Sequence, residues 1–205
     1  MLKLQTKTST VPAAAMSVMD AIEQRRSVRS YLRRSIDRAT VLGLLDAAVQ
    51  APTAVHEEPW AFAVVQNRET LRRLSEAALR TLRDREHGIH LPGSSSRHFV
   101  LPENVFYDAG TLIVIYGKPL GPFVAADCWL AAENLMLAAR AHGLGTCVIG
   151  LSVEALNSPE WKAELKVPPE MTAYAPIIVG VPAGETPASG RRAPDVLAWK
   201  ESLAV

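Results

Sequence analysis

The sequence predicts an α+β layered fold, in which a small central sheet is flanked by helices on both faces. Three short segments rich in β-branched and aromatic residues predict buried strands at Trp60–Gln66, Thr111–Gly117 and Tyr174–Pro182. The segments between them predict helices, but without the regular alternation of a parallel βαβ protein. A chain of 205 residues, 48% hydrophobic and 21% charged, suits one compact globular domain.

The first predicted helix begins at Ser17, where Asp20 three residues later completes an approximate capping box, and it ends near Arg26. Residues 1–16 precede it and are expected to form a flexible extension, without an apolar core of signal-peptide length. The helix residues expected to face the core are Val18, Ala21 and Ile22.

Two further helices are predicted in the N-terminal half. One begins after Asp37 and runs until Pro52 stops it. The other spans Glu69 to about Asp84 and is amphipathic. Its inward residues are Leu71, Leu74, Ala78 and Leu82.

A long helix is predicted from Phe123 to His142, with apolar residues on nearly all sides. Such a helix is buried on most faces, and in a chain this short it indicates the centre of an oligomer. Gly143 is suited to the left-handed cap, and His142 to the negative helix end. The remaining expectations are a strand or tight approach at Thr146–Gly150, a short helix near Pro159–Leu165, a long loop at Glu86–Asn104, and an irregular tail at Ala183–Val205.

Charge and composition exclude several classes of protein. A net charge of +1 does not indicate the basic face or stripe that nucleic-acid binding needs. No apolar run reaches the roughly 18 residues of a membrane helix. Cys128 and Cys147 are expected to be free thiols in a reducing compartment, which makes the cytoplasm the expected location. His87 and His90 could share one helical face, but without an organised carboxylate partner no metal site is predicted.

The stretch "RRSVRSY" concentrates positive charge on a neutral background, because Arg25, Arg26 and Arg29 lie within five positions around Ser27. Guanidinium forks match phosphate and carboxylate groups, so an anion site is one interpretation. A solvated basic turn is the other, and the spacing alone favours it.

Two loops are also candidates. "APTAVHEEPW", Ala51–Trp60, is a rigid segment between two prolines that suits either a pocket wall or a connector. "GLGTCVIG", Gly143–Gly150, is neither a GxGxxG fingerprint nor a P-loop, and in isolation suits a helix cap followed by a buried strand. Within it, Cys147 lacks an obvious base, so a structural thiol is favoured over a nucleophile.

Four motifs in order resemble the FMN-dependent nitroreductase family: "AIEQRRSVRSY", "APTAVHEEPWAFAVV", "AAENLMLAARAHGLGTCVIG" and "APIIVGVPAGETPASGRRAP". The resemblance covers about Ser17 to Lys200. It implies one FMN-binding domain over 17–205, in an intertwined homodimer with two FMN sites at the subunit interface. It also implies NADH or NADPH as reductant and a small-molecule electron acceptor.

The resemblance implies a role for each matched segment. Arg25 and Ser27 match the phosphate and ribityl contacts, with Arg26 beside them, while Arg29 matches a base that supports the reduced flavin electrostatically. The loop after the second helix matches a segment that reaches the partner subunit's flavin, and Arg191, with Arg192 as its competitor, matches a second phosphate base. The residues expected at the cofactor are Arg25, Arg26, Ser27, Arg29, Pro52, Thr53, Ala54, His56, Cys147, Val148, Ile149, Gly150 and Arg191.

The chain also departs from the family pattern. His56 and Glu58 stand where the family often has asparagine and glutamine. A helical excursion that covers the substrate in many relatives is missing after Gly117, which leaves Glu86–Asn104 as the candidate for that role. No catalytic side chains are predicted, because a flavin carries the hydride chemistry of a ping-pong cycle itself. The alternatives are enone reduction, dehalogenation or heterocycle oxidation on the same scaffold, or a non-enzymatic flavin-binding redox sensor.

Overall fold

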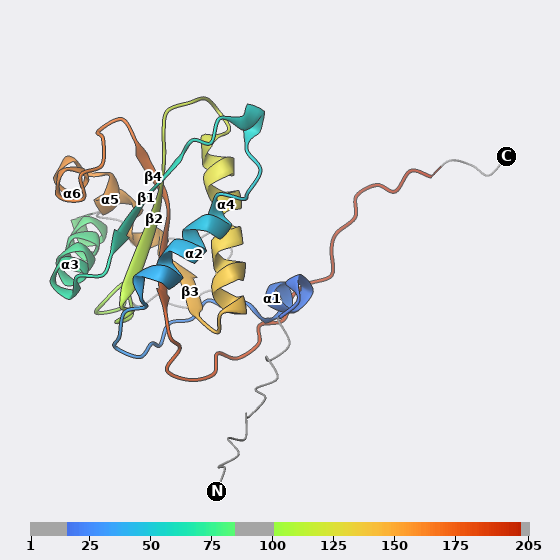
Figure 1. The fold of residues 1–205 in the computed structure, drawn as a ribbon, viewed down its shortest axis with the longest axis horizontal. Helices are drawn as coiled ribbons and strands as arrows, with labels where there is room; N and C mark the ends of the chain where they lie inside the picture. Colours follow the sequence, from blue (N-terminus) through green and yellow to red (C-terminus); the bar gives the residue numbers. More distant parts are fainter. Residues whose placement is uncertain (1–15, 85–100, 202–205) are drawn as a thin grey trace, which may run out of the picture.

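The computed structural model describes residues 16–84 and 101–201. In this part of the chain the central element is a four-stranded antiparallel sheet with the strand order β1-β2-β4-β3 (Figure 1). The α+β prediction is therefore confirmed. The strands are β1 (Trp60–Val65), β2 (Thr111–Gly117), β3 (Gly145–Val148) and β4 (Thr172–Gly180).

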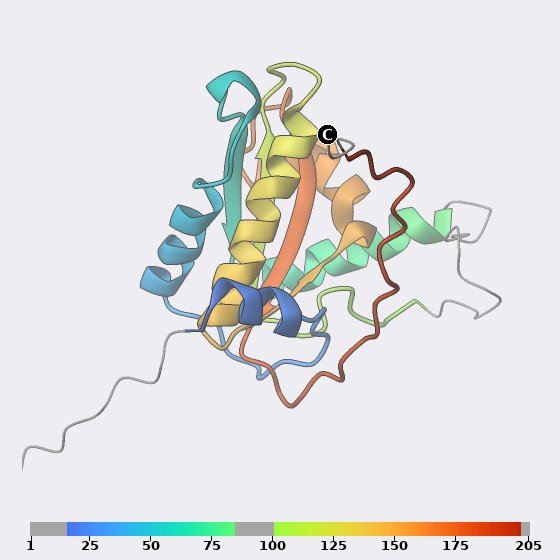
Figure 2. The same cartoon turned by 90° about the vertical axis from the view of Figure 1, so that its right-hand side faces the viewer.

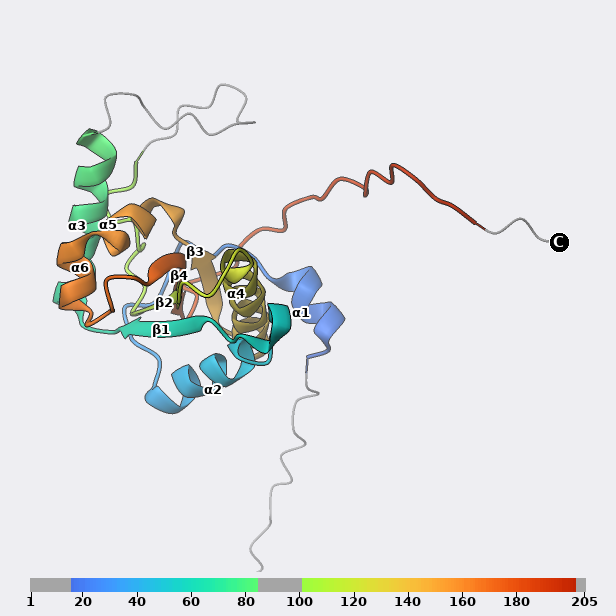
Figure 3. The same ribbon diagram turned by 90° about the horizontal axis from the view of Figure 1, so that it is seen from above.

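Helices cover both faces of this sheet, as predicted (Figure 3). Helices α2 and α4 pack on one face, and α3, α5 and α6 pack on the other. Helix α5 and the two 3-10 turns were not predicted from the sequence. The helices are α1 (Val18–Gln24), α2 (Arg38–Ala48), α3 (Arg68–Asp84), α4 (Val124–Ala141), α5 (Val153–Asn157) and α6 (Pro159–Glu164), with 3-10 turns η1 (Ala54–His56) and η2 (Gly150–Ser152).

The two central strands divide their side chains between the two helical layers. In β2, Ile113 and Ile115 pack toward α2 and α4, while Leu112 and Val114 belong to the cluster on the other face. This alternation follows from the two-residue period of a strand. Both faces are covered, so every residue of β2 is buried. The prediction of a buried strand holds less well for β1, an edge strand of the described sheet, where Val64 is exposed.

Helix α1 begins where predicted, because the Ser17 hydroxyl accepts a hydrogen bond from the Asp20 N–H at 3.1 Å and the Asp20 carboxylate completes the capping box. The prediction of its inward face was wrong for two residues. Ala21 is buried, but Val18 and Ile22 are 69% and 50% exposed. The helix lies across the C-terminal end of α4 (Figure 2). The face of the helix that carries Ala21 is buried against the rest of this chain.

Helix α4 packs against the sheet and α2, and eight of its eighteen residues are buried, which is less than the predicted burial on most sides. Gly143 has a φ of +71° just after it, which confirms the left-handed cap. The His142 ring nitrogen Nδ1 lies 2.8 Å from the Ala138 carbonyl oxygen in the last turn. However, Phe123, Trp129 and Leu130 at its N-terminal half are exposed large hydrophobic residues.

Cys128 on α4 gives a pH-dependent contribution to stability. Burial, with the nearby Asp127 carboxylate, raises the pKa of this thiol from 9.0 to about 12. Between those values the unfolded chain releases the proton and the folded chain keeps it, so the free energy of unfolding decreases as pH rises. We expect Cys128→Ala to lose less stability than the wild type from about pH 9 to about pH 12, measured by urea denaturation. Parallel declines in the two proteins would contradict this assignment.

The segment after β4 leaves the folded body. Residues 183–201 have no regular secondary structure, and beyond residue 188 they extend away from the sheet (Figure 1). Their large apolar side chains are exposed, with Leu197 at 92% and Trp199 at 78%. Of the predicted loop at 86–104, residues 86–100 lie outside the described part of the chain. Of the predicted extension at 1–16, residues 1–15 also lie outside it.

Candidate functional site

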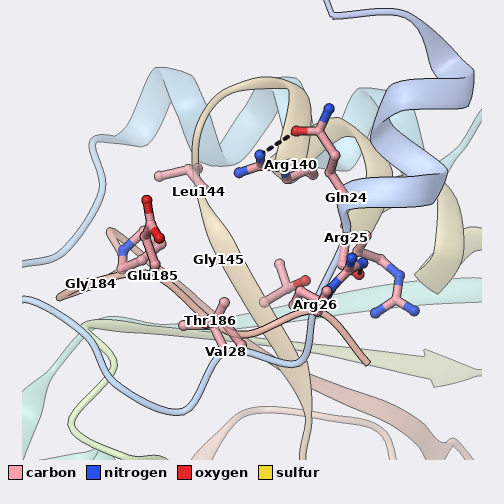
Figure 4. Close-up of a pocket in the computed structure, with 13 residues that line it drawn as sticks. Gln24, Arg25, Arg26, Val28, Arg140, Leu144, Gly145, Gly184, Glu185 and Thr186 are labelled. Atoms are coloured by element: carbon pink, nitrogen blue, oxygen red, sulfur yellow. Dashed lines mark hydrogen bonds between the residues drawn. The ribbon is translucent and has the colours of Figure 1, made fainter. Parts of the chain in front are cut away.

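A pocket of about 420 Å³ opens where the ends of α1 and α4 meet the start of β3 and the segment after β4 (Figure 4). Arg25 and Arg26, both predicted at the cofactor, line it, and so does Arg140 from the last turn of α4. Glu185 lines the opposite side. With three guanidinium groups and one carboxylate on its walls, the pocket is suited to an anion.

The arginine-bearing segment, residues 25–31, is held as an extended strip beside the sheet. Ser27 forms a parallel bridge with Thr146 of β3, and Tyr31 forms an antiparallel bridge with Pro182 after β4. The Val28 N–H donates to the Thr146 carbonyl oxygen at 2.9 Å. The segment therefore shares a wall with β3, and the two predicted site segments are neighbours in space.

Each pocket arginine has a different local partner. The Arg26 guanidinium donates to the carbonyl oxygens of Glu23 and Arg25 at 2.5 and 2.8 Å, so it caps the C-terminus of α1. Arg25 forms an ion pair with Glu133 of α4, with 3.4 Å between Nε and the carboxylate oxygen. Arg140 Nη2 donates to the Gln24 side-chain oxygen at 2.7 Å.

Ser27 and Arg29 lie beside Cys147, and all three are among the residues expected at the cofactor. Burial raises the pKa of the Cys147 thiol, and the charge of Arg29, a hydrogen bond with Ser27 and the charge of Arg25 oppose that shift. The net rise leaves the thiol protonated at neutral pH, which favours the structural interpretation over a nucleophile. Further along the same segment, the Ile149 N–H donates to the Pro176 carbonyl oxygen at 2.8 Å and is therefore engaged.

The predicted Pro52–Glu58 loop lies elsewhere in the chain. The Ala54 N–H donates to the buried Asp127 carboxylate at 3.1 Å, which places the loop at the N-terminal end of α4. Asp127 and Arg140 are thirteen residues apart on α4, so at about 1.5 Å per residue the helix separates them by about 20 Å. One chain therefore does not bring Pro52, Thr53, Ala54 and His56 together with the arginine pocket.

This loop is conformationally strained. Val55, His56 and Glu58 have φ values of 46°, 61° and 46°, in a region where residues other than glycine are rare. A β-branched residue such as Val55 is the least suited to it, and Val55 is 87% exposed. Such strain occurs preferentially at ligand-binding and switch segments.

Arg191 and Arg192 are exposed in the tail, beyond the pocket-lining residues 184–188. Neither has a hydrogen bond or ion pair with another described residue. The structure of one chain thus does not bring Arg191 to the pocket. Conversely, the sequence interpretation missed Arg140, although it is the basic residue in the last turn of an otherwise apolar helix.

Two kinds of feature are absent from the described residues. They contain no group of three or more His, Cys, Asp or Glu side chains placed to hold a metal ion. Within the same ranges, no helix combines the length and apolar character needed to span a membrane. His87 and His90 lie outside the described residues.

Solved structures with the same fold include flavin-binding nitroreductases. The chain superimposes on a crystal structure of a nitroreductase with bound FMN from Bacteroides fragilis with a TM-score of 0.75 and 27% identity, over 89% of this chain and 98% of that one. An FMN-dependent nitroreductase from Clostridium difficile has the same fold, with a TM-score of 0.72 at 23% identity, over 87% of this chain and 97% of that one.

The chain belongs to the nitroreductase family, whose model matches residues 22–181. This confirms the resemblance seen in the motifs and makes the protein an oxidoreductase. A relative from Archaeoglobus fulgidus, provisionally named an NADH dehydrogenase/NAD(P)H nitroreductase, is 32% identical over 80% of this chain and 84% of its own length. A 5,6-dimethylbenzimidazole synthase from Rhodospirillum rubrum is also 32% identical, over 82% of this chain and 84% of its own.

Proposed function

We propose that this chain is an FMN-dependent NAD(P)H oxidoreductase that reduces a nitroaromatic, quinone or similar small acceptor by a ping-pong mechanism. The observation that carries the proposal is the juxtaposition of the arginine-bearing segment, residues 25–31, with the start of β3. Both line one pocket, through Arg25, Arg26 and Val28 on one side and through Gly145 and Thr146 on the other. FMN has an anionic phosphate at one end and a planar ring at the other. When bound, it supplies the two-electron hydride chemistry between reductant and acceptor.

The residues present fit this cofactor. Arg25 and Arg140 offer guanidinium groups for the phosphate, and the buried Nε of Arg140 has no hydrogen-bond partner among the described residues. Arg29 and Ser27 lie beside Cys147, and in the proposed complex the ring lies against the Cys147–Gly150 segment. In the proposed enzyme these side chains bind and orient the cofactor, and Arg29 stabilises the negative charge that it gains on reduction.

Dimer formation is part of the proposal. The Pro52–Glu58 loop is held at Asp127, near the other end of α4 from Arg140, and none of its residues lines the arginine pocket. In the proposed dimer the partner chain supplies this loop to the flavin. The exposed apolar side chains of α1, α4 and the tail fit a surface covered by a partner. They include Val18, Met19, Ile22, Phe123, Trp129, Leu130, Val196, Leu197 and Trp199. Sedimentation should show a dimer at micromolar concentration, and a stable, flavin-loaded monomer would contradict it.

A visible spectrum followed by anaerobic titration with NADH and NADPH tests the proposal. We expect a yellow protein that is bleached by at least one nicotinamide and oxidises it steadily when a nitroarene or quinone is added. A colourless protein that takes up no added FMN would refute the function. A bound flavin that neither nicotinamide reduces would instead support a redox sensor.

The natural acceptor is a separate question, because relatives carry different names. A Comamonas testosteroni relative at 25% identity over 78% of this chain is named a chloronitrobenzene nitroreductase, whereas the Rhodospirillum rubrum relative is named a synthase. Steady-state rates with matched nitroarenes, quinones, enones and halogenated phenols distinguish nitro or quinone reduction from the alternatives.

Arg29→Met tests the proposed electrostatic role. Two unit charges about 5 Å apart interact by roughly 3 kcal/mol at an effective dielectric constant of 20. Because Arg29 is exposed, solvent screening should reduce this to about half. About 1.4 kcal/mol corresponds to roughly 30 mV for a two-electron couple. We therefore expect the midpoint potential of the bound flavin to fall by about 30 mV, measured by dye-coupled titration.

The retained cofactor is the internal control of that experiment. FMN should remain bound to Arg29→Met, because other guanidinium groups contact its phosphate. An unchanged potential combined with loss of FMN would assign Arg29 to phosphate binding instead.

A further inference from the structure

We propose that Arg140, the C-terminal arginine of α4, is a phosphate-binding residue of the pocket. No motif in the sequence and no matched family position assigned it this role. The inference rests on the proposed function, because it takes the phosphate to be that of FMN. It adds a binding residue from a third element, in addition to the arginine-bearing segment and the tail.

The position of Arg140 aims its guanidinium group at the pocket. Arg140 lies in the last turn of α4 and lines the pocket together with Gln24 of α1 (Figure 4). The Gln24 side-chain oxygen accepts a hydrogen bond from Arg140 Nη2 at 2.7 Å, which restrains the orientation of the planar fork. A restrained fork loses less conformational entropy when it binds an oxyanion than a free side chain does.

One atom of Arg140 lacks a partner. Its Nε is buried and has no hydrogen-bond acceptor among the described residues. Buried donors are nearly always satisfied in folded proteins, so such an atom calls for an acceptor from outside the chain. We take a phosphate oxygen to be that acceptor, reached when the Arg140 side chain adjusts as the ligand enters the adjoining pocket.

The three pocket arginines differ in the groups of the protein that already bind their guanidinium groups. Arg26 donates to two backbone carbonyl groups at the end of α1 and acts as a helix cap. Arg25 is paired with the Glu133 carboxylate. Arg140 has a neutral amide as its hydrogen-bonded partner, so its positive charge is less compensated than that of Arg25. An incoming dianion therefore interacts with Arg140 without first displacing a carboxylate.

The helix ends explain why a third guanidinium group is needed. Both α1 and α4 direct their C-termini toward this pocket, and the negative end of a helix dipole repels an anion. Glu185 on the opposite wall adds a further negative charge. Several cations must offset these contributions before a phosphate is stable there, and Arg140 lies directly at the end of α4.

The test compares FMN with riboflavin, which differs from it only by the phosphate. Dissociation constants are measured by flavin fluorescence on the full-length chain after reversible removal of flavin. We expect Arg140→Gln to weaken FMN binding about 10- to 150-fold and to leave riboflavin binding unchanged, as for loss of a charged hydrogen bond. Arg140→Lys, which keeps the charge but loses the fork, should give a smaller loss. Arg80→Gln, an exposed arginine on α3, is the matched control and should change neither constant.

Inorganic phosphate provides a second readout that does not require flavin. Phosphate should raise the thermal unfolding temperature of the flavin-free wild type and of Arg80→Gln, and much less that of Arg140→Gln. If Arg140→Gln fails to fold, Arg140→Lys and Gln24→Leu carry the test, and both should weaken FMN binding more than riboflavin binding.

The outcomes separate this inference from the proposed function. Wild-type FMN affinity in Arg140→Gln, or equal losses for FMN and riboflavin, would overturn the role of Arg140 and leave the function intact. A wild-type chain that binds no FMN at all would overturn the proposed function itself.

Discussion

Arg25→Ala weakens FMN binding by about 10- to 150-fold and leaves riboflavin binding nearly unchanged, if Arg25 binds the cofactor phosphate. The range corresponds to the loss of a hydrogen bond to a charged group, about 1.5–3 kcal/mol. Arg25 lines the pocket and has only 22% of its side chain exposed, so solvent replaces the lost interaction poorly. Flavin fluorescence titration of the full-length chain measures both constants. Equal losses for the two flavins would place the phosphate elsewhere.

The ion pair between Arg25 and Glu133 predicts that removing the Glu133 charge strengthens FMN binding. Glu133 holds the Arg25 guanidinium in the unliganded chain and therefore competes with phosphate for it. The carboxylate is 48% exposed, and exposed pairs contribute about 0.2–1 kcal/mol. Glu133→Gln should thus tighten FMN binding by up to about fivefold, and this gain should vanish in the double variant with Arg25→Ala. A gain that persists there would exclude competition for Arg25.

Gly145→Ala destabilises the protein by about 1–3 kcal/mol, as expected for overpacking in a close-packed interior. A Cβ atom at residue 145 would lie 2.7 Å from Val28 Cγ2 and 2.8 Å from Val28 Cβ. Val28 is β-branched, buried, and bonded through its N–H to Thr146, so it cannot rotate away. The added methyl group must push the arginine-bearing segment from β3. The free energy of unfolding from urea denaturation measures the effect.

The matched double variant identifies the cause. Val28→Gly removes the Cβ atom as well as the two methyl groups, so Gly145→Ala should be much less destabilising in that background than in the wild type. The FMN affinity lost in Gly145→Ala should recover in parallel. Additive losses in the double variant would show that the destabilisation does not arise from contact with Val28.

The sequence predicted those parts of the fold whose signals are local. Buried apolar runs located the strands, and Ser17, Asp37 and Gly143 marked helix ends because caps act over a few residues. The inward face of α1 was predicted wrongly because periodicity identifies an apolar face but not what covers it. Val18 and Ile22 form such a face, and this chain leaves them exposed.

The candidate site was predictable only in part, because spatial proximity is not local. The Arg25–Arg29 stretch and the Gly143–Gly150 stretch were found by motif, and the structure places them side by side. Arg140 was missed because its role depends on how the end of α4 meets α1. The Pro52–Glu58 loop is an example of the opposite kind, because its position at the other end of α4 from Arg140 emerges only from the fold.

The two bridges that hold the arginine-bearing segment also impose an order on biosynthesis. Ser27 pairs with Thr146 and Tyr31 with Pro182, so a segment made early gains its backbone partners only from residues made more than a hundred positions later. Because chains emerge from the ribosome N-terminus first, a nascent chain cannot assemble this pocket until β4 has been released. Cofactor loading therefore follows translation, and an mRNA truncated before the codons of β4 yields a chain without an assembled phosphate site.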